Sequence, residues 1–102
     1  MSTKNSPAMM SVFERVAQER HRQNILFVEG HIPFKCASRV ADPNRKLRVL
    51  MEEVGEVAEA IDLLETCKPG CKPHARMTNH LRDELTQVAA VAVAWLEAME
   101  EK

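Results

Sequence analysis

The chain has 102 residues, a mass of 11.5 kDa and a formal net charge of -1. This length is enough for one small domain, the balanced charge argues against a nucleic-acid partner, and no apolar run approaches the roughly 18 residues of a membrane span. With three glycines and no tyrosine, the composition favours helices over strands. We therefore expect an all-α domain with no nucleic-acid and no membrane partner.

Residues 1–10 are polar, contain Pro7 and show no periodicity, so they are expected to form a mobile leader before a single helical domain at 11–102. The N-terminus lacks the apolar segment and cleavage site of a secretory signal, which predicts a cytoplasmic protein with reduced cysteines. Ser11 is placed to cap a first helix that runs to about Leu26. Residues 29–43 carry Gly30, Pro33 and Pro43 and are expected to form a long connecting loop.

A second helix is predicted from about Asn44 to Glu65, with Asp42 or Asn44 as its cap. Its apolar side chains recur at steps of three or four residues: Leu47, Leu50, Met51, Val54, Val57, Ala58 and Ile61. The segment CKPGCKPH at 67–74 ends this helix, because proline and glycine cannot continue it.

A third helix is predicted from near Thr78 to about Met99, and its centre, VAAVAVAWL, is apolar almost all round. Ala90 and Val93 fall well away from the main apolar stripe, so this segment should be buried on more than one side. A three-helix monomer does not easily achieve that. We therefore expect a homo-oligomer, dimer or tetramer, most simply a dimer in which helix pairs from each chain complete a four-helix bundle.

Carboxylates concentrate on the second helix. Six of them lie within residues 52–65, namely Glu52, Glu53, Glu56, Glu59, Asp62 and Glu65. Glu53 and Glu56 share one edge of the helix with Lys46, and Glu53 borders the apolar stripe. Glu52, Glu59 and Asp62 are expected on the outward side, where a carboxylate needs no partner.

Glu84 is predicted to lie inside the apolar stripe of the third helix, where an ionised carboxylate needs a compensating cation. One alternative is a salt bridge to a basic residue of another helix, with Lys46, Arg48 and Arg22 as candidates. The other is a divalent metal shared by Glu53, Glu56 and Glu84, because carboxylate oxygens suit Mg²⁺. Since Mg²⁺ favours sites completed by phosphates, the second alternative indicates phosphate chemistry.

The segments EEVGEVAEAI (52–61) and DELTQVAAVAVAWLE (83–97) together resemble the MazG-like members of the all-α nucleoside triphosphate pyrophosphohydrolases. In that family one helix carries E-x-x-E, a later one carries E-x-x-D, and the four side chains hold Mg²⁺. The resemblance implies Glu53, Glu56, Glu84 and Gln87 as metal ligands, with Mn²⁺ as an alternative ion. Gln87 replaces the usual aspartate, so the site is either weaker or assisted by Asp83 or a water.

The resemblance also implies a house-cleaning hydrolase that cleaves a nucleoside triphosphate, often a non-standard or deoxy form, to the monophosphate and pyrophosphate. Glu53, Glu56 and Glu84 are the implied catalytic residues, with Glu53 expected to activate the attacking water as well. Side chains expected to meet the substrate are Lys46, Arg22 and Arg82 at the phosphates, and His31 and Phe34 in the loop that closes over the nucleotide.

Two rival interpretations remain open. Cys67, Cys71 and His74 have the spacing of a partial zinc site, although a helix-ending loop with free thiols explains them more simply. The second alternative is that the chain is a non-catalytic helical protein that forms oligomers, binds a partner and has a degenerate metal site. That hypothesis explains Gln87 but leaves a buried Glu84 without a reason.

Overall fold

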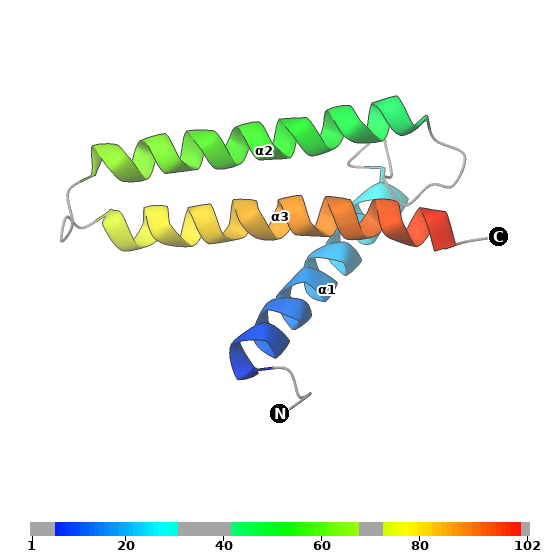
Figure 1. The fold of residues 1–102 in the computed structure, drawn as a ribbon, viewed down its shortest axis with the longest axis horizontal. Helices are drawn as coiled ribbons and strands as arrows, with labels where there is room; N and C mark the ends of the chain where they lie inside the picture. Colours follow the sequence, from blue (N-terminus) through cyan, green and yellow to red (C-terminus); the bar gives the residue numbers. More distant parts are fainter. Residues whose placement is uncertain (1–5, 31–41, 68–72, 101–102) are drawn as a thin grey trace.

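The computed structural model describes residues 6–30, 42–67 and 73–100, and within these ranges it is all-helical, without strands. The helices are α1 (Pro7–Val28), α2 (Pro43–Thr66) and α3 (His74–Glu100). α2 and α3 run antiparallel as a hairpin, and α1 crosses α3 obliquely (Figure 1). α1 and α2 each pack against α3, and within the described ranges they share no close backbone approach. None of the described helices has an apolar stretch long enough to cross a membrane.

Local capping explains why α1 begins earlier than predicted. α1 begins at Pro7 because the Ser6 side chain accepts a hydrogen bond from the Met9 amide at 3.1 Å, and proline suits the first helical position. Residues 7–10, assigned to the leader from the sequence, therefore belong to α1. α3 likewise begins at His74 rather than near Thr78.

The start of α2 agrees with one of its two predicted caps. The Asp42 side chain accepts a hydrogen bond from the Asn44 amide at 2.9 Å, and Pro43 opens the helix. Asp42 is therefore the cap. Asn44 lies inside the first turn.

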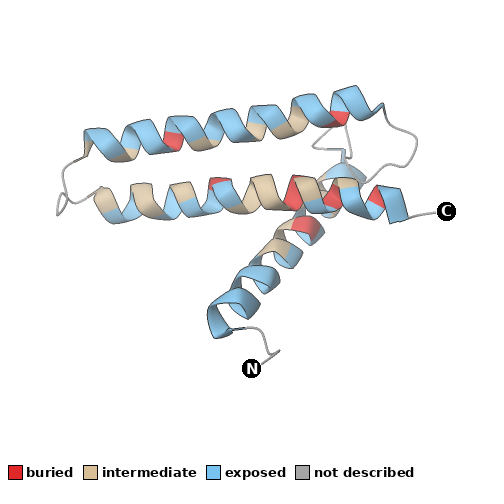
Figure 2. Cartoon of the chain, in the orientation of Figure 1, coloured by how far each residue is buried: buried red, intermediate tan, exposed pale blue. Residues whose placement is uncertain are grey.

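The buried apolar residues are few and small: Ala60, Ala90, Val91, Ala94 and Ala98. They gather along the contact between α2 and α3 and near the point where α1 crosses α3 (Figure 2). Val91 and Ala94 pack against Val49 and Leu50 of α2. The prediction that the centre of the third helix is buried on more than one side is confirmed in the single chain for Ala90, which is 0% exposed, and is wrong there for Val93, which is 37% exposed.

A buried arginine attaches α1 to α3. Arg20 is 7% exposed, and its Nε donates to Glu97 Oε2 of α3 at 2.5 Å. The same guanidinium donates to Gln23 Oε1 at 3.3 Å and to Asn24 Oδ1 at 3.4 Å. The C-terminal half of α1 is therefore fixed on α3, while its N-terminal half projects away from the hairpin (Figure 1).

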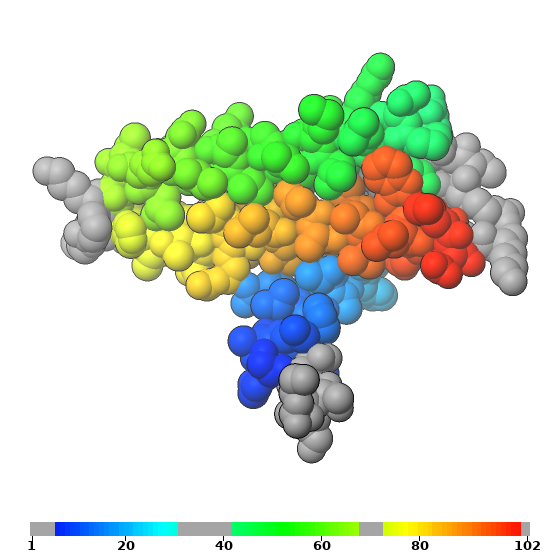
Figure 3. Space-filling view, in the orientation of Figure 1, coloured from blue at the N-terminus to red at the C-terminus, as the bar shows by residue number. Residues whose placement is uncertain are grey.

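One side of the hairpin exposes two rows of large apolar side chains. Leu47, Val54 and Ile61 of α2 follow a seven-residue step and are 40–51% exposed, and Leu85, Leu96 and Met99 of α3 are 52–72% exposed. Counting 100° per residue from the contact between the two helices, both rows turn away from α1, although Leu47 at the end of its row also lines a cleft that it shares with α1 residues. We call these six residues the hairpin apolar face. Figure 3 views the molecule from this side.

The oxidation state of Cys67 differs from expectation. The sequence predicts reduced thiols, but Cys67 at the end of α2 is disulfide-bonded. The prediction rested on the expected compartment, whereas pairing depends on which sulfur atoms the fold brings together.

Candidate metal centre

Three carboxylates from two helices meet at the α2–α3 contact. Glu53 and Glu56 stand one turn apart on α2, and Glu84 approaches from α3, with one oxygen of each residue within 4.8 Å of the others. Glu84 is 8% exposed, Glu53 is half-buried and Glu56 is exposed. The sequence grouped these three residues, and the structure brings them together. Glu52, Glu59 and Asp62 are exposed as predicted.

The cluster lacks internal compensation. Glu53 Oε2 and Glu84 Oε2 are buried and have no hydrogen-bond partner. Within the described ranges, the ion-pair contact of Glu84 is with His80 Nε2 of its own helix, at 3.7 Å. The predicted alternative of a salt bridge from Lys46, Arg48 or Arg22 is not formed there. Two orphaned carboxylate oxygens facing a third carboxylate are the donor set that a hard divalent cation such as Mg²⁺ requires.

Burial and mutual repulsion both disfavour ionisation of the cluster. Desolvation raises the pKa of Glu53 to about 7, and the neighbouring carboxylates of Glu56, Glu84 and Glu19 add to the rise. Desolvation also raises the pKa of Glu84; Glu56 adds to this effect, whereas the His80 imidazole acts against it. A bound cation would reverse this preference, because it favours the charged carboxylates.

A cleft of about 950 Å³ opens beside the cluster, between the C-terminal half of α1 and the N-terminal half of α2. Glu53 of α2 and Gln87 of α3 both line it. Its α1 wall carries polar side chains, namely Glu19, Arg20, Arg22, Gln23 and Asn24, and its α2 wall adds Arg45 and Arg48. The cleft therefore combines carboxylate, guanidinium and amide groups with apolar patches such as Val49 and Val91, a mixture that suits a polar organic ligand.

Gln87 and Arg22, two residues predicted for the site, lie at the cleft. Gln87 is half-buried and lies one turn after Glu84 on α3, and Arg22 lines the same cleft from α1. Asp83, suggested as an assistant ligand, is exposed and lines a smaller cavity together with Gln87 and Arg22.

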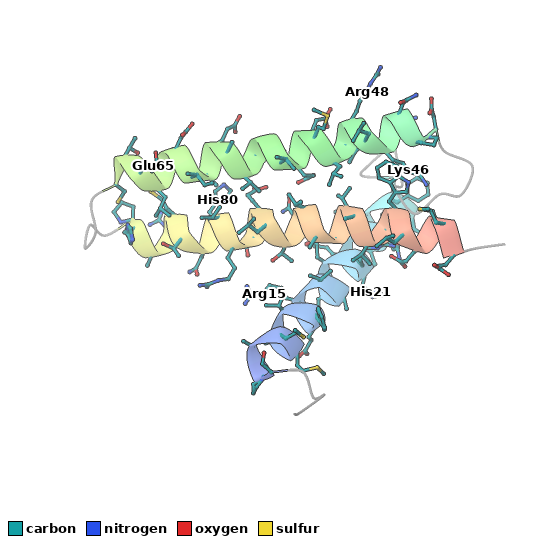
Figure 4. All side chains as sticks on the ribbon, in the orientation of Figure 1. Arg15, His21, Lys46, Arg48, Glu65 and His80 are labelled. Carbon is teal, nitrogen blue, oxygen red and sulfur yellow. The ribbon has the colours of Figure 1, made fainter. Side chains whose placement is uncertain are left out.

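Two other predicted phosphate ligands lie elsewhere. Lys46 is 3% exposed, lies between α2 and α3 (Figure 4), and does not line the cleft. Arg82 is exposed and donates to Asn79 Oδ1 at 3.0 Å on its own helix. His31 and Phe34, predicted to close over a nucleotide, fall outside the described residues.

Most residues of the α1 wall of the cleft were not predicted from the sequence as site residues. Glu19 accepts hydrogen bonds from Arg22 Nε at 2.8 Å and from Arg22 Nη2 at 2.6 Å, and its side chain is only 13% exposed. The i, i+3 spacing of the two residues was a readable signal for the pair. That the pair faces Glu53 depends on how α1 crosses α3, which no local pattern specifies.

The zinc alternative has no geometric support in the described part of the chain. Cys67 is engaged in a disulfide and so is not available as a thiolate ligand, and Cys71 lies outside the described ranges. His74 Nδ1 is buried without a hydrogen-bond partner.

Comparison with known proteins adds no identity: no protein-family model, no curated protein and no solved structure matches this chain. Any assignment of function therefore rests on the carboxylate cluster and the adjoining cleft, together with the motif resemblance.

Proposed function

We propose that this protein is a MazG-like, Mg²⁺-dependent nucleoside triphosphate pyrophosphohydrolase, with Mn²⁺ as an alternative ion. Its substrates are ribo- or deoxynucleoside triphosphates, including non-canonical ones, and its products are the monophosphate and pyrophosphate. The observation that carries the proposal is the group formed by Glu53, Glu56 and Glu84, in which a nine-tenths buried carboxylate keeps an oxygen without a partner.

The three carboxylates would hold the ion, with the Gln87 amide oxygen as the neutral fourth donor in place of the usual aspartate. Bound there, the cation supplies neutralisation of phosphate charge and polarisation of the α-phosphate. Two carboxylates from one helix and one from another fit the family pattern of E-x-x-E followed by a later acidic motif. The replacement of an aspartate by Gln87 lowers the charge of the site and hence its affinity for the ion.

Among the protein groups, Glu53 is the residue proposed to act on water. Its carboxylate accepts a proton from a water whose oxygen attacks the α-phosphorus, and the bond from that phosphorus to the α,β-bridging oxygen breaks as pyrophosphate leaves. Arg22 at the cleft is the proposed cation for the phosphates, and Lys46 and Arg82 are more distant candidates. Glu53 suits its role because it is half-buried and lines the cleft.

The direct test is product analysis with a panel of ribo- and deoxynucleoside triphosphates and Mg²⁺. We expect wild type to release a monophosphate and pyrophosphate, and Glu53→Gln to release neither. Glu59→Gln is the matched control, since it removes an exposed carboxylate from the same helix outside the cleft. The proposal fails if wild type turns over no triphosphate, or if Glu53→Gln and Glu59→Gln are equally active.

The second candidate is a non-catalytic oligomeric interaction protein with a degenerate metal site. The observation that favours it is Gln87, whose amide brings no negative charge to the centre. Under this hypothesis wild type binds a cation or a nucleotide without releasing pyrophosphate. The same product analysis, combined with calorimetric titration of Mg²⁺, separates the two functions.

We also propose that two copies of the chain associate through the hairpin apolar face. Each row extends over 14 residue steps, about 21 Å of helix, and two adjacent helices that are each about 10 Å wide give a patch of roughly 400 Å². A patch of this size lies within the range of the largest apolar patch on a monomer, and such patches often mark an interaction site. A second copy offers an identical surface, so a twofold arrangement of two hairpins would make a four-helix bundle.

A further inference from the structure

Arg22 is held by only one edge of its guanidinium. Its Nε and Nη2 atoms donate to the carboxylate of Glu19, at 2.8 and 2.6 Å, whereas no described residue accepts a hydrogen bond from Nη1. The two side chains are also buried unequally, because Glu19 is 13% exposed and Arg22 is 54% exposed. A surface ion pair normally exposes both partners. Here the anion is withdrawn into the protein and the cation is presented outward.

The position of this pair is fixed by the residue beside it. Arg20, on the same turn of α1, is buried and bound to Glu97 of α3, which fixes the helix where it crosses α3. Arg22 and Glu53 line the same cleft from opposite helices. They do not form an ion pair with each other, so the guanidinium is available to an anionic group whose other end would be held by a cation at the carboxylate cluster.

We propose that the free Nη1 edge of Arg22 binds a phosphate of the substrate and that Glu19 is the positioning residue that holds Arg22 for it. The assignment rests on the proposed function, because it takes the ligand of the cleft to be a triphosphate. Guanidinium favours phosphate through parallel N–H donors in a fixed plane, and a carboxylate on one edge orients the other edge before the ligand arrives. Preorganisation of this kind lowers the entropic cost of binding.

The test measures binding of inorganic tripolyphosphate in the presence of Mg²⁺ by calorimetry, which requires neither turnover nor a particular base. The variants are Glu19→Gln, Arg22→Ala and the double variant, with Glu14→Gln as the control because Glu14 is an exposed carboxylate on the same helix. We expect Kd to rise about 10-fold for Glu19→Gln and about 30-fold for Arg22→Ala, typical of a charged hydrogen bond. The double variant should be no weaker than Arg22→Ala, since Glu19 acts through Arg22.

Two further measurements distinguish a variant that has lost its fold from one that has lost only the positioning of Arg22. These readouts are measured at pH 8.5, well above the Glu53 pKa of about 7, so that the effect of Glu19 on that pKa no longer alters metal binding. Under these conditions the Mg²⁺ affinity without tripolyphosphate should stay within about twofold of wild type in Glu19→Gln, and the variant should retain a cooperative thermal unfolding transition. With a hydrolysed triphosphate, KM should rise about 10-fold while kcat changes less than twofold, because the interaction is with the bound phosphate in ground and transition states alike.

Each remaining outcome is decisive. The inference is overturned if Glu19→Gln binds tripolyphosphate as wild type does, or if wild type binds no tripolyphosphate. It is also overturned if the loss of affinity in the double variant equals the sum of the losses in Glu19→Gln and Arg22→Ala. If wild type binds tripolyphosphate with the expected variant pattern but cleaves no nucleotide, the Arg22 site stands and the hydrolase proposal fails instead.

Discussion

Glu84 stands in an environment that normally excludes a carboxylate. It is 8% exposed, one oxygen has no hydrogen-bond partner, and two further carboxylates lie nearby. An unpaired charge in such a place costs several kcal/mol, so the residue is a liability for the metal-free fold. A carboxylate that weakens its own fold is explained most simply by a ligand that uses it.

Glu84→Gln should have opposite effects on the stability of the metal-free protein and on Mg²⁺ binding. Glu84→Gln removes the desolvated charge and its repulsion with Glu56, so the metal-free protein should gain about 1 kcal/mol of unfolding free energy at pH 8. The same substitution should abolish the stabilisation by Mg²⁺. Urea unfolding with EDTA or Mg²⁺ measures both effects, with Glu59→Gln as the control. A structural salt bridge would instead make Glu84→Gln less stable.

The raised pKa of Glu53 predicts a pH dependence of the same metal-free protein. The folded-state pKa of about 7 exceeds the ordinary value of 4.5, so the folded state binds the proton more tightly than the unfolded state. The stabilisation that comes from protonated Glu53 is therefore lost as pH rises from about 4.5 to 7. Above pH 7 the effect of Glu53 on the free energy of unfolding no longer changes with pH. In EDTA, the melting temperature of Glu53→Gln should exceed that of wild type by a margin that grows between pH 5 and pH 8. A margin that is constant with pH would contradict the shift.

Metal affinity should follow the same titration in the other direction. Because the cation requires ionised carboxylates, binding below pH 7 must displace the proton of Glu53. We expect the apparent Mg²⁺ affinity to fall about 10-fold per pH unit below 7 and to level off above it, as for one displaced proton. Calorimetry in buffers of different ionisation enthalpy counts the protons released. Release of none at pH 6 would exclude Glu53 as a ligand.

For single residues, the sequence predicted burial or exposure correctly where these depend on the periodicity of one helix. The burial of Glu84 and the exposure of Glu52 and Glu59 follow from helical periodicity alone, and both were predicted. The burial of Glu19 and its approach to Glu53 depend on the crossing of two helices, so periodicity within α1 does not reveal them. The predicted role of Lys46 illustrates the same limit, because a shared helix edge did not place it at the cleft.

At the scale of elements, small side chains on α3 allow close packing. Ala90, Ala94 and Ala98 are at most 4% exposed, at four-residue steps, where α3 meets its neighbours. Alanine at these positions lets helix backbones approach closely, and larger side chains would force them apart. The helix boundaries were less predictable, since Ser6 and Ser11 are equally suitable caps by residue type and the proline after Ser6 favours the earlier start.

Overpacking this surface should be costly. Ala94→Leu inserts a larger side chain at a position that is 1% exposed, and we expect it to lower the unfolding free energy by about 1–3 kcal/mol. Ala75→Leu, at an exposed position in the first turn of the same helix, should change it by less than about 0.5 kcal/mol. Chemical denaturation of both variants gives the comparison. Equal effects would show that Ala94 is not closely packed.

At the scale of the whole molecule, the single chain buries too little. In the described ranges its buried apolar residues are four alanines and one valine, while several leucine, methionine and phenylalanine side chains are exposed and the others described are half-buried. Small domains gain little stability from a core of this size and often require association. The sequence predicted an oligomer because a monomer was not expected to bury the apolar centre of the third helix, but Ala90, Val91 and Ala94 of that segment are already buried in the single chain. It did not indicate which surface would be shared, because that depends on the side from which α1 covers the hairpin.

The hairpin apolar face predicts the oligomeric state of the protein and the substitutions that should change that state. Wild type should sediment at about twice 11.5 kDa at micromolar concentration, with a melting temperature that rises with protein concentration. Val54→Lys and Leu96→Lys should shift the mass toward 11.5 kDa, because a charge in the centre of an apolar contact is desolvated without a partner. Leu63→Lys is the matched control: Leu63 is as exposed as Val54, at 49% against 51%, and lies nine residues further on, half a turn away on the opposite side of α2.

Footprinting of the unaltered chain provides a test that does not depend on whether the variants fold. With hydroxyl radicals, Leu96 and Met99 should become protected as protein concentration rises, whereas Met10, 54% exposed on the projecting half of α1, should react equally at all concentrations. Association through α1 would reverse this pattern, with Met10 protected and Met99 reactive. A protein that stays monomeric at all concentrations would show no protection at either residue, and the large apolar surface of the hairpin would then be exposed in the working molecule.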